Sequence, residues 1–180
     1  MTLWKRAFDV CGAVGGLLFF GPVMACVAAV ILVDDGRPIL FRQARLGRGR
    51  RTFEILKFRS MRDGRVTRAG RVLRATGLDE LPQFLNILRG DLSAVGPRPV
   101  TEGDAERYGW TGPSAAPRWR VQPGLTGLGQ LAGRSPRESL GLDRCYARRR
   151  SFAFDCRLIA LSFVVNALGK TRARRLLFGQ

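Results

Sequence analysis

The sequence predicts a helix-rich α/β protein, in which a re-entrant membrane helix hairpin over residues 1–36 precedes a small cytosolic domain over residues 37–180. Three observations lead to this fold class. They are a long uncharged apolar stretch, two short β-prone runs separated by a glycine-rich loop, and apolar residues at helical spacing farther along. The second part is expected to hold one β-hairpin and interfacial amphipathic helices, and 180 residues leave room for one modest domain beyond the anchor.

The apolar stretch runs from Val10 to Val33 and carries Gly21-Pro22 at its centre. About 24 apolar residues are enough to span roughly 30 Å of hydrocarbon as one helix. A proline removes a backbone donor and clashes with the preceding turn, so a kink or a break is expected near Phe20 to Pro22. Two half-helices would each be too short to cross alone, and this favours a hairpin that enters and leaves by the same face.

The charges on both sides of the stretch bear on its topology. Lys5 and Arg6 precede it and many arginines follow it. Positive charge resists translocation, which favours a hairpin with both flanks in the cytosol. A single kinked crossing is the alternative. A cleaved signal peptide is disfavoured, because the apolar run is too long and no small-residue cleavage site ends it.

The composition narrows the chemistry. Thirty-one Lys and Arg against 14 Asp and Glu give a formal net charge of +17, so the partners should be anionic: phospholipid headgroups, a phosphorylated substrate or nucleic acid. The four cysteines form no CxxC pair, so neither a zinc site nor a disulfide framework is indicated. With no histidine, Ser-His and Cys-His mechanisms are excluded.

The β-prone runs are Ile39-Leu40-Phe41 and Thr52 to Phe58, and the glycines between them predict a hairpin. Phe53, Ile55 and Leu40 are expected to face a core. Basic side chains surround them and would either lie on anionic lipid or contact a substrate; they are Arg42, Arg45, Arg51, Lys57 and Arg59.

A helix is expected to begin near Asp79, with that residue as its N-cap, and to end at Gly90. Its apolar residues recur at three and four positions and predict one buried face; they are Leu81, Phe84, Leu85 and Leu88. Beyond the helix, two prolines should hold Pro97-Arg98-Pro99 stiff and extended.

The rest of the chain is less regular. Residues 101–120 are expected to form a surface loop with a short helix around Asp104 to Tyr108, and the segment from Gln122 to Gly127 a rigid turn. Leu158 to Leu168 is apolar but too short to span a membrane, so it should lie in the interface or pack on the core.

Asp79 and Glu80 are the candidates for chemistry. Adjacent carboxylates at a helix start often serve only as caps. Here Arg74 precedes the pair and Arg98 follows in its proline clamp. Carboxylates that hold a divalent cation while guanidinium groups hold phosphate oxygens form an arrangement suited to phosphoryl transfer.

Five ordered motifs carry a resemblance to a known family. The chain resembles the bacterial sugar transferases, the monotopic phosphoglycosyl transferases, from Lys5 to about Leu168, and it looks like their minimal catalytic-core form. The motifs are Lys57-Phe58-Arg59-Ser60-Met61, Leu78-Asp79-Glu80-Leu81-Pro82-Gln83, Gly90-Asp91-Leu92-Ser93, Val95-Gly96-Pro97-Arg98-Pro99 and Pro123-Gly124-Leu125-Thr126-Gly127.

The resemblance implies transfer of a phosphosugar from a nucleotide diphosphate sugar, usually a UDP-sugar, to polyprenyl (undecaprenyl) phosphate, with UMP released. It implies that Asp79 is the nucleophile that forms a covalent phosphosugar intermediate, and that Glu80 and Asp79 bind Mg²⁺. Lys57, Arg74 and Arg98 would bind phosphates, and Pro97 and Pro99 would shape the nucleotide end. The re-entrant helix would bend at Pro22, with the catalytic domain on the cytosolic face of the bacterial inner membrane among its phospholipids.

Some positions depart from the family pattern or have no role assigned. Leu128 stands where the family usually has tryptophan, and Asp143 and Tyr146 match a further acidic and aromatic pair without a defined role. A nucleic-acid-binding protein and a non-catalytic membrane scaffold are the rival interpretations; the missing nucleic-acid motifs argue against the first and the intact dyad against the second. The sequence does not specify the sugar, the pathway or the oligomeric state.

Overall fold

The computed structural model describes residues 2–135 and 137–168 and confirms a helix-rich α/β fold. The helices are α1 (Leu3–Asp35), α2 (Arg68–Thr76), α3 (Gln83–Arg89), α4 (Glu102–Arg107), α5 (Ala116–Trp119), α6 (Leu128–Leu131), α7 (Leu140–Arg149) and α8 (Phe152–Leu168). The strands are β1 (Leu40–Leu46), β2 (Thr52–Phe58), β3 (Met61–Arg62), β4 (Arg65–Val66), β5 (Ser93–Val95) and β6 (Gly124–Thr126). They pair as three small sheets, β1–β2 and β3–β4 antiparallel and β5–β6 parallel.

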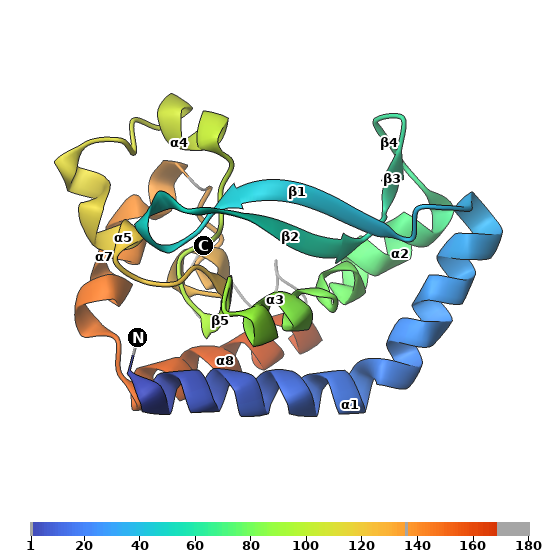
Figure 1. Ribbon diagram of the computed structural model, residues 1–180, viewed down its shortest axis with the longest axis horizontal. Helices are drawn as coiled ribbons and strands as arrows, with labels where there is room; N and C mark the ends of the chain where they lie inside the picture. The colour runs from blue at the N-terminus through green and yellow to red at the C-terminus, as the bar shows by residue number, and fades with distance from the viewer. Residues whose placement is uncertain (1, 136, 169–180) are drawn as a thin grey trace.

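Helix α1 is one continuous element of 33 residues that runs through Pro22 and bends along its length (Figure 1). Since sharp bends in helices arise mostly at proline, the predicted effect of Pro22 takes the form of a kink rather than a break. Four of its residues are buried, Asp9, Ala13, Val27 and Ile31, while Leu18 and Phe19 are more than three-quarters exposed. Among the described helices, α1 is the one long and apolar enough to cross a membrane, judged by length and composition.

The predicted hairpin is confirmed, with a first strand longer than expected. Leu40 pairs with Phe58 and Leu46 with Thr52. Helix α3 packs along the other edge of β2. There the side-chain amide of Asn86 forms hydrogen bonds with the backbone of β2, as a neighbouring strand would. Its Oδ1 accepts from the Leu56 N–H at 2.9 Å and its Nδ2 donates to the Glu54 carbonyl at 2.6 Å. This completes the hydrogen bonds of a strand edge that would otherwise be buried and unpaired.

The predicted helix from Asp79 to Leu88 is wrong at its start. A 3₁₀ turn covers Leu78–Glu80, and α3 begins only at Gln83, with Pro82 at its N-cap position and no side-chain cap. Pro82 has no N–H to donate, so the helical ladder starts after it. The end at Gly90 is confirmed by a left-handed φ of 90°.

The predicted buried face of this helix is confirmed only in part. The residues expected to be buried, Leu81, Phe84, Leu85 and Leu88, are half-buried, and the fully buried ones are Gln83, Asn86 and Ile87. Phe84 and Leu88 pack against a hydrophobic cluster that includes Ala13 of α1. The other face of α3 packs on the edge of β2, where the polar side chain of Asn86 is buried. The spacing of apolar residues does not predict this burial.

Residues 101–120 do not form the expected surface loop, although the short helix is present as α4. Trp110, Ala105 and Ala115 are almost fully buried and pack with Leu46 and Val100 in one of the hydrophobic clusters. The C-terminal apolar segment forms part of α8, whose Leu158 and Val165 enter a second cluster around β5. Packing on the core, one of its two expected placements, is therefore confirmed.

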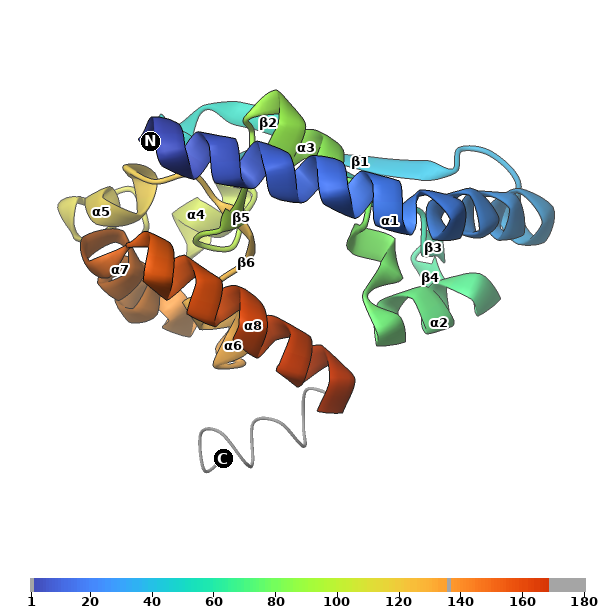
Figure 2. The ribbon, with the colours of Figure 1, turned by 90° about the horizontal axis from the view of Figure 1, so that it is seen from below.

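The amino-terminal end of α1 is bound into the core by charge. The Lys5 ammonium lies 2.9 Å from both Asp9 Oδ1 and Asp155 Oδ2, whose carboxylates are buried. Asp9 Oδ1 also accepts from the Ala94 N–H at 3.1 Å, which attaches α1 to β5. Figure 2 shows that α1 and α8 lie close together at this end and diverge from it.

Two arginines bind helix C-terminal ends. Arg6 of α1 donates to the Ile87 and Leu88 carbonyls at the end of α3. Arg59 donates to the carbonyls of Asp35 and Gly36 at the end of α1. A guanidinium placed there satisfies carbonyls that have no helical partner and complements the helix dipole. Both ends of α1 are thus attached to the folded domain.

We predict that Lys5→Met lowers the free energy of unfolding by about 3–5 kcal/mol, because it leaves two buried carboxylates without their cation. Thermal and urea unfolding in detergent micelles measure the change. Adding Asp155→Asn to Lys5→Met should recover part of the loss. Arg42→Ala, which breaks an exposed ion pair with Glu54, is the control and should cost under about 1 kcal/mol. Equal losses for both variants would contradict the assignment.

Candidate active site

The two adjacent carboxylates lie in the 3₁₀ turn between α2 and α3. Helix α2 ends at Gly77, whose φ of 75° lets the chain reverse direction without strain. The next three residues form the turn, which buries Asp79 to 8 % exposure and leaves Glu80 half-buried. Asp79 is therefore a buried residue of a 3₁₀ turn and does not cap a helix.

Lys57 and Arg74 bring positive charge to this turn from two different elements. The Lys57 ammonium, on β2, lies 2.6 Å from Glu80 Oε1. Arg74 is on the last turn of α2, and its charge acts on Asp79. The structure thus brings together four of the predicted residues, two carboxylates and two cations.

The acidity of Asp79 reflects opposing effects. Burial raises the pKa of Asp79 above its ordinary value, and the Glu80 carboxylate raises it further. Lys57 and Arg74 act in the opposite direction, as does a backbone hydrogen bond. The net effect is a carboxyl group whose charged form is less well solvated than in bulk water, with two cations that offset part of this cost.

Asp79 and Glu80 offer the ligand type that Mg²⁺ takes in proteins. Mg²⁺ is usually held by one or two carboxylates together with substrate phosphates and water. The Glu80 carboxylate adds to the rise that burial causes in the pKa of Asp79, and a cation beside the two carboxylates would offset that repulsion. The described residues contain no group of three or more acidic, histidine or cysteine side chains of the kind that holds a metal by protein ligands alone.

Pro97, Arg98 and Pro99 lie apart from this cluster. Arg98 is exposed, and its charge lowers the pKa of the neighbouring Arg45, an effect smaller than that of burial, whereas it is not among the charges acting on Asp79. The backbone packs closely just before this segment. Gly96, just before it, packs backbone to backbone on β6, where a Cβ at Gly124 would meet the Gly96 nitrogen at 2.0 Å.

A buried ion pair behind this segment was not predicted from the sequence. Arg118 Nη1 lies 3.2 Å from Asp143 Oδ2, and both side chains are almost fully buried. Burial lowers the pKa of Arg118 to about 10 and raises that of Asp143 to about 6, with each partner opposing the shift of the other. Among many exposed arginines, Arg118 is distinguished in the sequence only by the tryptophans at 110 and 119.

Tyr146, the other residue left without a role, is buried beside the first strand of the parallel pair. Its hydroxyl lies 2.9 Å from both the Val95 carbonyl oxygen and Asp155 Oδ1. Burial, followed by the Asp155 charge, raises the pKa of Tyr146. Tyr146 therefore stays protonated and connects the Lys5 cluster to β5.

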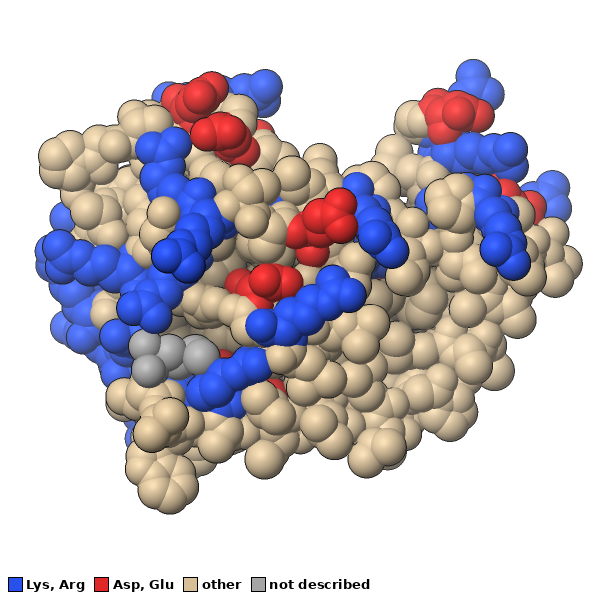
Figure 3. Space-filling model, in the orientation of Figure 1, with Lys and Arg blue, Asp and Glu red and all other residues tan. Residues whose placement is uncertain are grey.

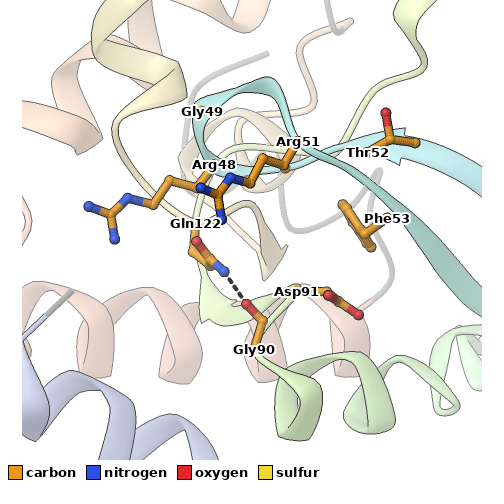
Figure 4. A pocket seen from close by; sticks show the side chains of 9 residues that line it. Arg48, Gly49, Arg51, Thr52, Phe53, Gly90, Asp91 and Gln122 are labelled. Atoms are coloured by element: carbon orange, nitrogen blue, oxygen red, sulfur yellow. Dashed lines mark hydrogen bonds between the residues drawn. The ribbon is translucent and has the colours of Figure 1, made fainter.

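A cavity of about 610 Å³ opens beside the turn of the β1–β2 hairpin (Figure 4). Arg48, Arg51 and Phe53 line it from the hairpin, and Asp91 and Gln122 from the opposite side. None of the predicted site residues is among those that line it. The dyad instead faces Lys57, near the other end of β2.

Comparisons with known proteins identify the family. The family of bacterial sugar transferases matches residues 1–169. A UDP-glucose:undecaprenyl-phosphate glucose-1-phosphate transferase of Caulobacter vibrioides is 43% identical over 74% of this chain and 55% of its own length. An enzyme of the same name from Escherichia coli is 36% identical over 89% of this chain and 39% of its own length. The exopolysaccharide production protein ExoY of Rhizobium meliloti is 38% identical over 82% of this chain and 74% of its own length. The chain thus spans about half the length of several relatives.

We predict that Glu80→Gln lowers the pKa of Asp79 and that Lys57→Met raises it, because the first removes a like charge and the second a cation. The protonated fraction of Asp79 at a given pH then falls in Glu80→Gln and rises in Lys57→Met. Carbon-13 NMR titration of the aspartate carboxyls measures both. Glu54→Gln, an exposed change on the opposite face of β2, is the control, and equal titration of Asp79 in all variants would refute the described electrostatics.

Proposed function

Because the chain belongs to the bacterial sugar transferase family, we propose that it transfers a phosphosugar from a UDP-sugar to undecaprenyl phosphate, producing undecaprenyl diphosphosugar and UMP. The observation that carries the proposal is the buried Asp79 beside Glu80, with Lys57 and Arg74 at hand. The names of relatives, which include glucose and N-acetylgalactosamine phosphotransferases acting on undecaprenyl phosphate, support the same reaction class.

The proposed reaction has two steps. An Asp79 carboxylate oxygen attacks the β-phosphorus of the donor, the bond from that phosphorus to the bridging oxygen breaks, and UMP leaves with the electron pair. An oxygen of the lipid phosphate then attacks the same phosphorus, and the Asp79 carboxylate is released. A carboxylate is ionised at neutral pH and needs no general base, which suits a chain without histidine.

Positive side chains reduce the barrier to the first step. The diphosphate repels an anionic nucleophile, so its charge has to be neutralised as the two approach. Arg74 already acts electrostatically on Asp79, and Lys57 holds Glu80 at 2.6 Å, so both are placed for this task. We propose that Asp79 and Glu80 hold Mg²⁺ and that the ion, when bound, withdraws charge from the diphosphate.

The attachment of α1 supports a re-entrant anchor in place of a crossing. A straight crossing would put the first residues and everything after Asp34 on opposite sides of the bilayer. Yet Lys5 and Arg6 at one end bind α8 and α3, and Asp35 at the other end binds Arg59. A folded domain on one face of a membrane can hold both ends of a helix only if neither end lies on the opposite face.

The distribution of charge agrees with this orientation. In Figure 3 the lower side of the molecule, where α1 runs in Figure 1, is almost free of charged side chains, and lysines and arginines lie above it. Basic side chains near a membrane surface attract anionic headgroups. We propose that the domain lies on the cytosolic face of the inner membrane, with Asp79 near the level of the lipid phosphate.

We predict that the purified protein with Mg²⁺, undecaprenyl phosphate and a panel of UDP-sugars releases UMP with at least one of them, and that Asp79→Asn lowers this rate by at least about 10³-fold, because the amide is not a nucleophile. Incubation with a labelled donor, without the acceptor, should leave phosphosugar on Asp79 in mass spectrometry. Full turnover in Asp79→Asn would exclude the covalent step.

We predict that cysteines placed at Thr2 and Arg37, in a chain whose native cysteines are serine, react with a membrane-impermeant maleimide in inverted inner-membrane vesicles and not in spheroplasts. Both sites lie outside α1, one at each end. Labelling of the two positions from opposite sides would instead establish a crossing helix.

A further inference from the structure

The segment that carries Arg98 is held through its backbone from several directions. The Val95 carbonyl accepts from Tyr146 and the Pro97 carbonyl from the Gly124 N–H, both at 2.9 Å. Farther on, the Pro99 carbonyl accepts from Arg45 at 3.5 Å and the Val100 carbonyl from the Leu46 N–H at 2.8 Å.

The carbonyl of Arg98 itself is held by a charge. Arg118 Nη2 donates a hydrogen bond to it, while Nη1 of the same guanidinium pairs with Asp143. Because the peptide unit is planar, holding this carbonyl fixes the plane of the Arg98–Pro99 peptide, and with it the ψ angle at the Cα that carries the Arg98 side chain. The Arg98 side chain is exposed and forms no ion pair with any residue in the described part of the chain.

Arg118 is itself immobilised to an unusual degree for an arginine. It is 3 % exposed, and its guanidinium carbon lies 4.4 Å from the Trp110 ring centre and 4.8 Å from that of Trp119. Its Nε is buried and has no hydrogen-bond partner among the described residues. Burying such a charge is costly unless it is paired, and the planar fork lets one group meet both a carboxylate and a carbonyl.

We propose that Arg118 is a positioning residue: by holding the carbonyl of Arg98 it directs the Arg98 side chain toward a phosphate of the nucleotide diphosphate donor. This inference rests on the proposed function, and it adds to that function a residue that does not touch substrate. Asp143 holds Arg118 in place, and the two tryptophans restrict its plane. Arg98 is separate from the charges around Asp79, so it acts on donor binding more than on the chemical step.

The experiment measures donor kinetics of Arg118→Lys in the full-length protein in detergent. Lysine keeps the charge but cannot meet Asp143 and the carbonyl with one planar group. We expect the KM for the UDP-sugar to rise on the order of tenfold while kcat changes less than about threefold, because an interaction made equally before and during reaction affects KM alone. Arg98→Ala should give the same pattern.

A double variant separates positioning from a structural role. If Arg118 acts through Arg98, Arg98→Ala with Arg118→Lys should have the KM of Arg98→Ala alone, because the phosphate interaction that Arg118 supports is already absent once the Arg98 side chain is removed. A further tenfold rise in the double variant would overturn the proposal, as would an unchanged KM in Arg118→Lys. Should Arg118→Lys not fold, Asp143→Asn replaces it in the same cycle, with the same two deciding outcomes.

Val165→Ala is the matched control. It removes buried methyl groups of α8 from the core and none of the groups that hold Arg118 or Arg98, so we expect a lower melting temperature with an unchanged KM. A KM that rises in step with the loss of stability in all variants would show that the cluster acts only on folding. Absence of UMP release from the wild-type protein would instead refute the proposed function, which keeps the two failures distinct.

Discussion

One half-buried ammonium group, held between two buried carboxylates, joins the apolar helix to the rest of the protein. Lys5 lies between the carboxylates of Asp9 and Asp155, and Asp9 also binds the backbone of β5. Charges removed from water in this way are stable only as a complete set. Helix α1 is therefore a part of the core, and under the proposed function the depth at which it lies in a membrane would set the depth of the site.

A second constraint is the close approach of backbones near the proline clamp. Gly96, Gly124 and Gly127 let β5 and β6 pack where any side chain would collide. The polar cluster at Lys5 reaches the same strand through Tyr146. The position of the Arg98 segment thus follows from two sources, glycine packing on one side and buried hydrogen bonds on the other, and neither allows the segment much freedom.

The charges around Asp79 bear on how a chain without histidine could carry out the proposed reaction. The proposed mechanism, in a chain without histidine, uses a nucleophile that is already ionised, and carboxylates are weak nucleophiles. Burial and Glu80 raise the pKa of Asp79 while Lys57 and Arg74 oppose the rise. The same cations that hold Asp79 in its ionised form are suited to an anionic substrate, so one set of charges serves both the resting site and the proposed reaction.

Local sequence determined the features that depend on covalent geometry and composition: the length of the apolar helix and its bend at Pro22, the hairpin, the stiffness around Arg98 and the presence of an acidic pair. Tertiary structure decided the rest. Asp79 lies in a turn and does not cap a helix. Trp110, in a segment expected to be a surface loop, is buried in a hydrophobic cluster. Lys5 pairs with Asp155, a carboxylate far away in the sequence. These outcomes depend on which surfaces meet and exclude water, and the spacing of residues along a chain does not contain that information.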